Sequence, residues 1–190
     1  MRMLPQNIFL ILWLAWFLCW YVAAFGTKRT VRHESLGSRL GHVVPLMVGV
    51  WLIAKPSPAL GALDHRFVPG SWVAYWSCAA VTAAGLLFTV WARVHLGRNW
   101  SGTVTVKEQH TLITSGPYAA VRHPIYTGLL IAILASALAV GNWRSLIGFL
   151  ISCAALWRKL RLEESWMQQT FGDAYVAYKS RVRALIPYIL

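Results

Sequence analysis

Residues 115–128 read SGPYAAVRHPIYTG, and an apolar run follows them directly. The stretch combines a glycine-proline turn, an Arg-His pair, a second proline and two tyrosines. Because the residue before a proline avoids helical backbone angles, His123 should be the last non-helical residue and Pro124 should begin a helix. A helix that only crosses a bilayer needs one or two polar anchors at its start. The density of donors and acceptors here therefore predicts a polar binding site at the start of a membrane helix.

Apolar runs recur along the whole chain. They cover residues 8–25, 43–53, 72–92, 125–140 and 146–157. A hydrocarbon core about 30 Å thick needs roughly 20 helical residues. The first and third runs provide that length, and the others reach it only with polar-looking flanks. Because the chain is 57% hydrophobic and only 13% charged, it is also poor in charge for a soluble protein. We predict an all-α integral membrane protein with about five transmembrane helices.

The net charge of +12 has two ordinary explanations, which are nucleic-acid binding and cytoplasmic membrane loops rich in Lys and Arg. With the N-terminus outside, most of the eighteen Lys and Arg residues fall in cytoplasmic segments. This distribution favours the membrane and predicts no nucleic-acid partner. It also puts the C-terminus and the 93–124 loop in the cytoplasm, at the cell membrane or, in a eukaryote, at the endoplasmic reticulum.

The two halves of the chain differ in character. Residues 1–92 contain three hydrophobic segments and are predicted to be an N-terminal transmembrane scaffold. Residues 93–190 hold nearly all of the suggestive chemistry and are predicted to be the catalytic, cofactor-binding region. The three cysteines, Cys19, Cys78 and Cys153, lie far apart in apolar runs, so neither a disulfide nor a metal site is predicted.

Turn signals organise the second half. The segments 103–106 and 111–114 predict the two strands of a short β-hairpin. Gly141 and Asn142 predict a tight turn between the last two apolar runs, which would then form a helical hairpin.

A cytosolic helical segment follows this hairpin in our prediction. Gly172 should end a polar helix and Asp173 should cap the next one. That last helix, over 174–184, is amphipathic and is expected to lie along the cytosolic membrane surface.

The predicted helical hairpin brings distant polar residues together. It puts the start of the fourth run and the end of the fifth at one depth, so Glu163 and Glu164 should face Arg122, His123 and Tyr126. A glutamate accepts both hydroxyls of a ribose, and a histidine with backbone N–H groups at a helix start suits a carboxylate. S-adenosylmethionine offers these groups together with a sulfonium that another carboxylate attracts.

Three separated motifs carry a family resemblance. They are Gly-Pro-Tyr-x3-Arg-His-Pro-x-Tyr-x-Gly at 116–128, the pair Glu163-Glu164, and Phe-Gly-x2-Tyr-x2-Tyr-x2-Arg-Val-x3-Ile-Pro at 171–187. Over about 96–187 the chain resembles the isoprenylcysteine carboxyl methyltransferase family and its prokaryotic relatives. The resemblance implies a membrane enzyme that takes S-adenosylmethionine from the cytosol and methylates a lipophilic acceptor from the bilayer. The implied reaction is carboxyl O-methylation of an isoprenylcysteine-like substrate.

The resemblance also implies roles for individual residues. The expected cofactor-binding residues are Tyr118, His123, Pro124, Tyr126, Leu112, Ile113, Glu163 and Glu164. The expected catalytic residues are Arg122, Glu163, Glu164 and Arg161. One arginine should bind both oxygens of the acceptor carboxylate, with Arg122, Arg158 and Arg161 as candidates.

Three other functions stay open at this point. A phospholipid or small-lipid N-methyltransferase would need a base for its amine, and Glu163 or Glu164 could serve. A membrane sterol reductase with a nicotinamide cofactor (NADPH) carries a related Arg-His-Pro-x-Tyr motif, but it is typically larger and has Asn where this chain has Ile125. A non-catalytic membrane scaffold would need none of the charges at 122, 163 and 164.

Overall fold

The computed structural model describes residues 7–25, 30–54, 60–100, 103, 105–107 and 111–189. Within these residues the chain forms five long helices, which are α1 (Ile8–Ala24), α2 (Leu36–Ala54), α3 (Trp72–Leu96), α5 (Pro124–Val140) and α6 (Trp143–Phe171). The shorter elements are β1 (Thr30–His33), η1 (Gly61–Asp64), η2 (Gly97–Asn99), β2 (Thr105–Lys107), α4 (Pro117–Ala120) and α7 (Asp173–Arg181). The chain is mainly helical, as predicted, with one two-stranded ribbon added.

Two helices of the described part are long and apolar enough to cross a membrane, namely α2 and the continuous stretch of α3 and η2. Helix α2 begins well before the apolar run 43–53, so its polar flank extends it as predicted. Helices α1 and α5 are also apolar, but each has only 17 residues, slightly short of the roughly 20 that a span needs. These features are consistent with an all-α membrane protein.

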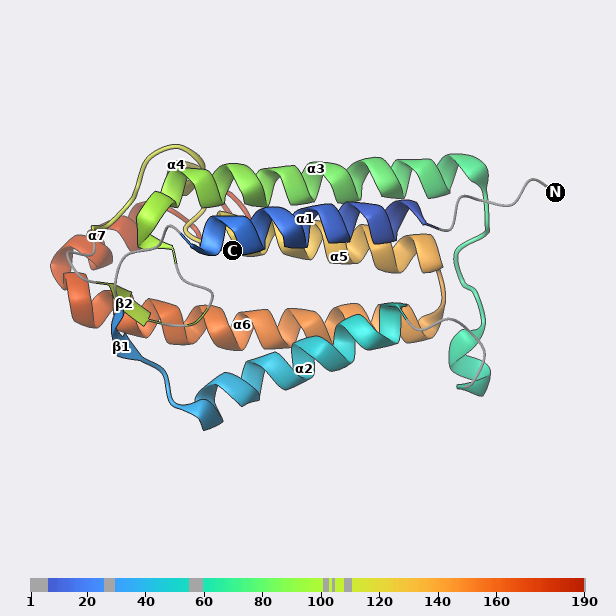
Figure 1. Cartoon of the computed structure of the whole chain (residues 1–190), viewed down its shortest axis with the longest axis horizontal. Helices are drawn as coiled ribbons and strands as arrows, with labels where there is room; N and C mark the ends of the chain where they lie inside the picture. The colour runs from blue at the N-terminus through green and yellow to red at the C-terminus, as the bar shows by residue number, and fades with distance from the viewer. Residues whose placement is uncertain are drawn as a thin grey trace.

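The long helices form two groups (Figure 1). Helix α3 lies along α5, α1 lies against α3, and α2 lies along α6. Indole N–H groups of α1 hold the first group together, because Trp16 donates to Thr89 on α3 at 2.6 Å and Trp13 donates to Ser136 on α5 at 3.2 Å. The helices α5 and α6 connect the two groups.

Facing glycines set the closest approach within each group. A Cβ on Gly85 of α3 would lie 2.7 Å from the carbonyl oxygen of Gly128 on α5, and a Cβ on Gly128 would lie 2.6 Å from that of Gly85. Gly49 of α2 and Gly148 of α6 face each other in the same way. Small residues let helix backbones approach closely, and tight van der Waals packing then supplies the association energy inside a membrane.

Gly128→Ala is expected to lower the free energy of unfolding by about 1–3 kcal/mol, because the new methyl group has no room against α3. Gly37→Ala is the matched control, since nothing lies within 4 Å of a Cβ at that helical position and alanine is the better helix former by about 1 kcal/mol. Thermal unfolding in detergent measures both variants. A melting temperature for Gly128→Ala equal to that of wild type would contradict the close crossing.

The turn between α5 and α6 is built by two residues that the sequence singles out. Gly141 has φ +71° and ends α5, and the Asn142 side chain accepts a hydrogen bond from the Ser145 N–H at 2.9 Å and begins α6. Beside this turn, the buried Arg144 donates through Nε to Asp64 of η1 at 2.7 Å and also donates to the Leu52 carbonyl. The turn reverses the chain, so α5 and α6 run in opposite directions (Figure 1).

The predicted β-hairpin over 103–114 is wrong. Strand β2 pairs antiparallel with β1, which lies between α1 and α2, and residues 111–114 form no strand. Residues 108–110 lie outside the described residues. Strand β1 takes the hydrogen-bonding edge that the hairpin would have used, and the segment 111–113 instead lines a cavity. The partner came from a connection some 70 residues away, which local strand signals do not specify.

The C-terminal region differs from its prediction in detail. Gly172, with φ +53°, ends α6 as predicted, but Asp173 is the first residue of α7 and not its cap. Helix α7 ends at Arg181, earlier than the predicted residue 184. The chain leaves the helix because the carbonyls of Arg183 and Ala184 accept hydrogen bonds from the backbone N–H groups of residues 122 and 123, at 2.8 and 3.0 Å.

Candidate functional site

The start of α5 has the predicted backbone. His123 lies outside the helix with φ −125° and ψ 61°, and Pro124 is the first helical residue. The C-terminal tail fixes this segment, and Tyr178 of α7 fixes the turn before it by donating its hydroxyl to the Tyr118 carbonyl at 2.5 Å. Burial raises the pKa of Tyr178 to about 12, so this hydroxyl remains a donor at physiological pH.

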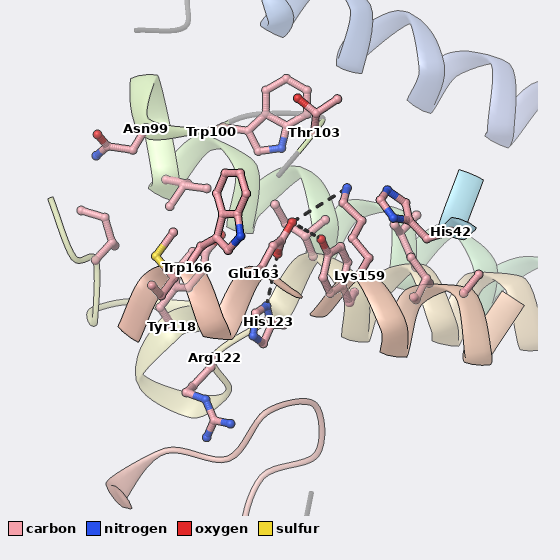
Figure 2. Close-up of a pocket in the computed structure, with 18 of the residues that line it drawn as sticks. His42, Asn99, Trp100, Thr103, Tyr118, Arg122, His123, Lys159, Glu163 and Trp166 are labelled. Carbon is pink, nitrogen blue, oxygen red and sulfur yellow. Dashed lines mark hydrogen bonds and ion pairs between the residues drawn. The ribbon is translucent and has the colours of Figure 1, made fainter. Parts of the chain in front are cut away.

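Glu163 meets the start of α5 from α6. Its Oε1 accepts a hydrogen bond from the Tyr126 hydroxyl at 2.5 Å, its Oε2 lies 3.7 Å from His123 Nδ1, and Lys159 Nζ lies 3.9 Å from Oε1. The Glu163 side chain keeps 21% of its surface exposed. Figure 2 shows it between His123 and Lys159. The carboxylate thus sits among donors and stays accessible to a ligand.

Glu164 contacts a different set of residues. Arg122 donates to its Oε1 through Nε at 2.8 Å and also through Nη2, and Lys179 lies 2.8 Å from its Oε2. Burial alone would raise the pKa of this carboxyl, but nearby His123 and the donors of Lys179 and Arg122 hold the pKa well below its usual range. Glu164 is therefore an ionised, buried anchor that ties α6 to α7 and to the start of α5.

A cavity of about 320 Å³ lies beside Glu163, within the range of small-molecule sites, roughly 300–1,000 Å³. At its polar end lie Glu163, His123, Lys159 and the hydroxyls of Tyr118 and Tyr126. Burial, the largest cause, and the charge of Glu163 raise the pKa of Tyr118 above its usual range, so its hydroxyl stays neutral. The apolar part of the wall is formed by Val43, Leu46, Ile125, Leu129, Ala155 and Leu156.

The predicted site residues divide into two sets. The residues that line the cavity are Leu112, Ile113, Tyr118, Arg122, His123, Tyr126 and Glu163. Pro124, Glu164, Arg158 and Arg161 are not among the lining residues. Arg161 is exposed and precedes Glu163 by two residues, a spacing that puts the two on different faces of a helix.

The prediction missed the contribution of the first half of the chain. Trp16 and Trp20 of α1 and Arg39, His42, Val43 and Leu46 of α2 all line the cavity. The positions 39, 42, 43 and 46 have the spacing of one helical face, a signal that was present in the sequence. The prediction of a scaffold for residues 1–92 assigns this face no part in the site.

Aromatic side chains close one wall of the cavity. Trp100, seen at the top of Figure 2, lines it and packs edge-on against Trp20 with ring centroids 5.6 Å apart. The guanidinium of Arg93 lies 4.2 Å from the centre of the Trp100 ring and donates to the carbonyls of Ala23 and Gly97, at 2.6 and 2.8 Å. Arg93 thus connects the end of α1 to the loop that carries Trp100.

A second hollow lies between the outer faces of α5 and α6 and has a volume of about 660 Å³. Its walls include Leu130, Leu134, Phe149 and Trp157, and among the described residues no charged side chain lines it. It is larger than the cavity beside Glu163 but lacks the polar groups that orient a reacting ligand. We therefore assign the candidate site to the smaller cavity.

The polar end of the cavity fits S-adenosylmethionine. Nε2 of His123 is buried and lies 3.5 Å from Glu164 Oε1, but it makes no hydrogen bond of good geometry with any described residue, so it could donate to or accept from a ligand. The Glu163 oxygens accept hydrogen bonds from hydroxyl groups, as they already do from Tyr126. Trp100 and Trp166 provide flat apolar surfaces. In the described residues no cluster of three His, Cys, Asp or Glu side chains could hold a metal ion.

Comparison with known proteins finds a family match in the middle of the chain. Residues 78–169 match the model of the isoprenylcysteine carboxyl methyltransferase (ICMT) family. A protein-S-isoprenylcysteine O-methyltransferase of Schizosaccharomyces pombe is 36% identical over 104 residues, which are 52% of this chain and 43% of that protein. Protein-S-isoprenylcysteine O-methyltransferase B of Arabidopsis thaliana is 29% identical over 133 residues, 65% of this chain and 66% of that protein. A probable protein-S-isoprenylcysteine O-methyltransferase of Oryza sativa subsp. indica is 33% identical over 114 residues, 58% of this chain and 53% of that protein.

The chain spans about half the length of the Schizosaccharomyces pombe and Oryza sativa relatives and 66% of the Arabidopsis thaliana one. The family-model match, over residues 78–169, begins within α3 and ends near the end of α6, so it contains the start of α5, Glu163, Glu164 and Trp100. The cavity walls contributed by α1 and α2 lie outside it.

Proposed function

Because residues 78–169 match the model of the isoprenylcysteine carboxyl methyltransferase family, we propose that the chain is a member of this family and methylates the carboxylate of an isoprenylcysteine-like lipid with S-adenosylmethionine as methyl donor. One observation carries the proposal. A single cavity joins a polar end, with Glu163 and His123, to an apolar wall formed by Val43, Leu46 and Leu129. This combination suits an acceptor with a carboxylate at one end and a hydrocarbon chain at the other.

S-adenosylmethionine, when bound, supplies a methyl group on a positively charged sulfur. Glu163 would accept the ribose hydroxyls, and Nε2 of His123 would bind the carboxylate of the donor. Tyr118 and the segment at Leu112 and Ile113 would lie against the adenine. The accessible Glu163 carboxylate and the buried His123 Nε2, which makes no hydrogen bond with the described residues, support these roles.

The chain itself has to orient the reactants and exclude water. A carboxylate acceptor is already anionic and needs no base, so positioning accounts for most of the acceleration. Trp100 and Trp166 would shield the reacting groups from water. Arg122 and Glu164 would act as positioning residues, because their ion pair holds the start of α5 against α6 and α7.

We further propose how the protein sits in the membrane. The five long helices would cross the bilayer, with α5 and α6 as a helical hairpin, and the polar end of the cavity and the C-terminus would face the cytosol. The excess of Lys and Arg in the segments at that end supports this orientation. Residues 93–190 would provide the polar end of the site, and residues 1–92 would provide part of the lipid-facing wall.

Methyl transfer with purified, detergent-solubilised protein tests the function. Methyl-labelled S-adenosylmethionine is offered with N-acetyl-S-farnesylcysteine or with phosphatidylethanolamine. We expect label in the farnesylcysteine as a methyl ester that mild alkali releases as methanol. Alkali-stable label in phosphatidylethanolamine would favour an N-methyltransferase, and no transfer to either acceptor would contradict the proposal.

A further inference from the structure

The acceptor carboxylate needs a cationic partner at the site. In the described part of the chain, the Lys and Arg side chains that line the cavity are Arg39, Arg122 and Lys159. Which of them is available to a ligand depends on the contacts that each already makes.

Arg122 is fully engaged within the protein. Its Nε and Nη2 donate to Glu164, and its Nη1 donates to the carbonyl of Val182 and, at 3.4 Å, to that of Lys179. In Figure 2 its side chain points away from Glu163. Binding an acceptor through Arg122 would require breaking a buried ion pair, so this arginine is better explained as a structural anchor.

Lys159 is held at the polar end. Its ammonium lies 3.9 Å from Glu163 and 5.6 Å from the centre of the Tyr126 ring. It balances the charge of Glu163, the carboxylate that we propose binds the ribose hydroxyls of the methyl donor. A lysine also offers a point charge, whereas an arginine presents two parallel N–H groups to a carboxylate.

Arg39 differs from both of these residues. It lies in the first turn of α2, is exposed, and makes no ion pair with any described residue. Its guanidinium therefore has free donors at the edge of the cavity.

The face of α2 below Arg39 continues as an apolar wall. Val43 and Leu46 lie four and seven residues further on, which places them on the same face, and both line the cavity. With a rise of 1.5 Å per residue, this face extends about 10 Å from Arg39 to Leu46. Leu129 of α5 and Leu156 of α6 also line the cavity. A cationic side chain followed by an apolar strip complements a prenylcysteine, which has a carboxylate at one end and a hydrocarbon chain at the other.

We propose that Arg39 binds the carboxylate of the lipid acceptor and that the Val43–Leu46 face of α2 holds its hydrocarbon chain. This inference rests on the proposed function and adds an acceptor-binding residue outside the region that the family match covers. Arg39 would orient the carboxylate by two parallel hydrogen bonds, so it acts on acceptor binding and alignment and leaves the binding of the methyl donor unchanged.

The test compares the acceptor N-acetyl-S-farnesylcysteine with its carboxamide, which has the same shape but no negative charge. Competition binding gives the ratio of the affinity for the carboxylate to the affinity for the carboxamide. This ratio is measured for wild type, Arg39→Met, Arg39→Lys, Lys159→Met and the exposed control Arg181→Met. We expect Arg39→Met to lower this ratio at least tenfold and Arg39→Lys to restore part of it. Arg181→Met should match wild type, and the affinity of Arg39→Met for S-adenosylmethionine should change less than twofold.

The possible failures are distinguishable. If wild type transfers no methyl group to the farnesylcysteine, the proposed function fails whatever the Arg39 variants do. If wild type transfers it and Arg39→Met keeps the full preference for the carboxylate, the function stands and the role of Arg39 is refuted. A loss of preference in Lys159→Met but not in Arg39→Met would likewise refute it and assign the role to Lys159.

Discussion

Replacing Glu163 by alanine is expected to weaken S-adenosylmethionine binding at least tenfold, which corresponds to about 1.4 kcal/mol. Glu163 is the carboxylate that lines the polar end of the cavity within the described residues, and it already accepts a hydrogen bond from Tyr126. Its loss removes the acceptor for the ribose hydroxyls and leaves the Tyr126 hydroxyl without its partner. Calorimetric titration of the solubilised protein measures the change.

Two comparisons make this experiment specific. Glu163→Gln keeps the shape of the side chain and one acceptor oxygen, so its loss of affinity for S-adenosylmethionine should be smaller than that of Glu163→Ala. Asp173→Ala removes an exposed carboxylate at the start of α7 and should bind like wild type. Equal affinities for wild type and Glu163→Ala would remove Glu163 from the binding site.

The second large effect concerns the ion pair between Arg122 and Glu164. Arg122→Met alone is expected to destabilise the protein by about 3–5 kcal/mol, because the buried Glu164 carboxylate loses its arginine partner and keeps only Lys179 and the neighbouring His123 among the described residues. The double variant Arg122→Met with Glu164→Leu should recover much of this loss, since it removes both buried charges. Chemical denaturation in detergent, without ligands, measures both variants.

The same ion pair should limit stability in acid. Glu164 has a pKa well below its usual range in the folded state, whereas an unfolded glutamate titrates near 4.3. Its stabilising contribution is therefore complete above about pH 4.3 and is lost as the pH falls towards the folded pKa. Glu164→Gln should flatten the fall in stability below about pH 4.3. A single Arg122→Met variant as stable as wild type, or an unchanged acid profile in Glu164→Gln, would contradict the anchoring role.

Much of the polar end could be predicted from the sequence because its signals are local. Gly141 and Asn142 determine the turn that reverses the chain, and His123 and Pro124 determine where α5 begins. Given an antiparallel pair of helices, residues forty positions apart must come together, and Arg122 does contact Glu164. The different surroundings of Glu163 and Glu164 were not predicted, because neighbouring residues on a helix point in different directions and only the packing decides which meets the cavity.

The apolar wall could not be predicted by the same means. Which helices face each other depends on contacts such as Gly85 with Gly128 and Gly49 with Gly148, and those pairings are far apart in sequence. Arg39 became a candidate for acceptor binding only when the packing of α2 along α6 brought it to the cavity. The partner of β2 was missed for the same reason.

Photo-cross-linking with a prenylcysteine that carries a diazirine on its hydrocarbon chain tests the shared cavity most directly. The labelled residues are identified by mass spectrometry, with and without excess unlabelled N-acetyl-S-farnesylcysteine. We predict competed adducts on the wall formed by Val43, Leu46 and Leu129. Competed adducts confined to the outer hollow, at residues such as Leu134 and Phe149, would contradict an account in which one cavity holds both the lipid acceptor and the methyl donor.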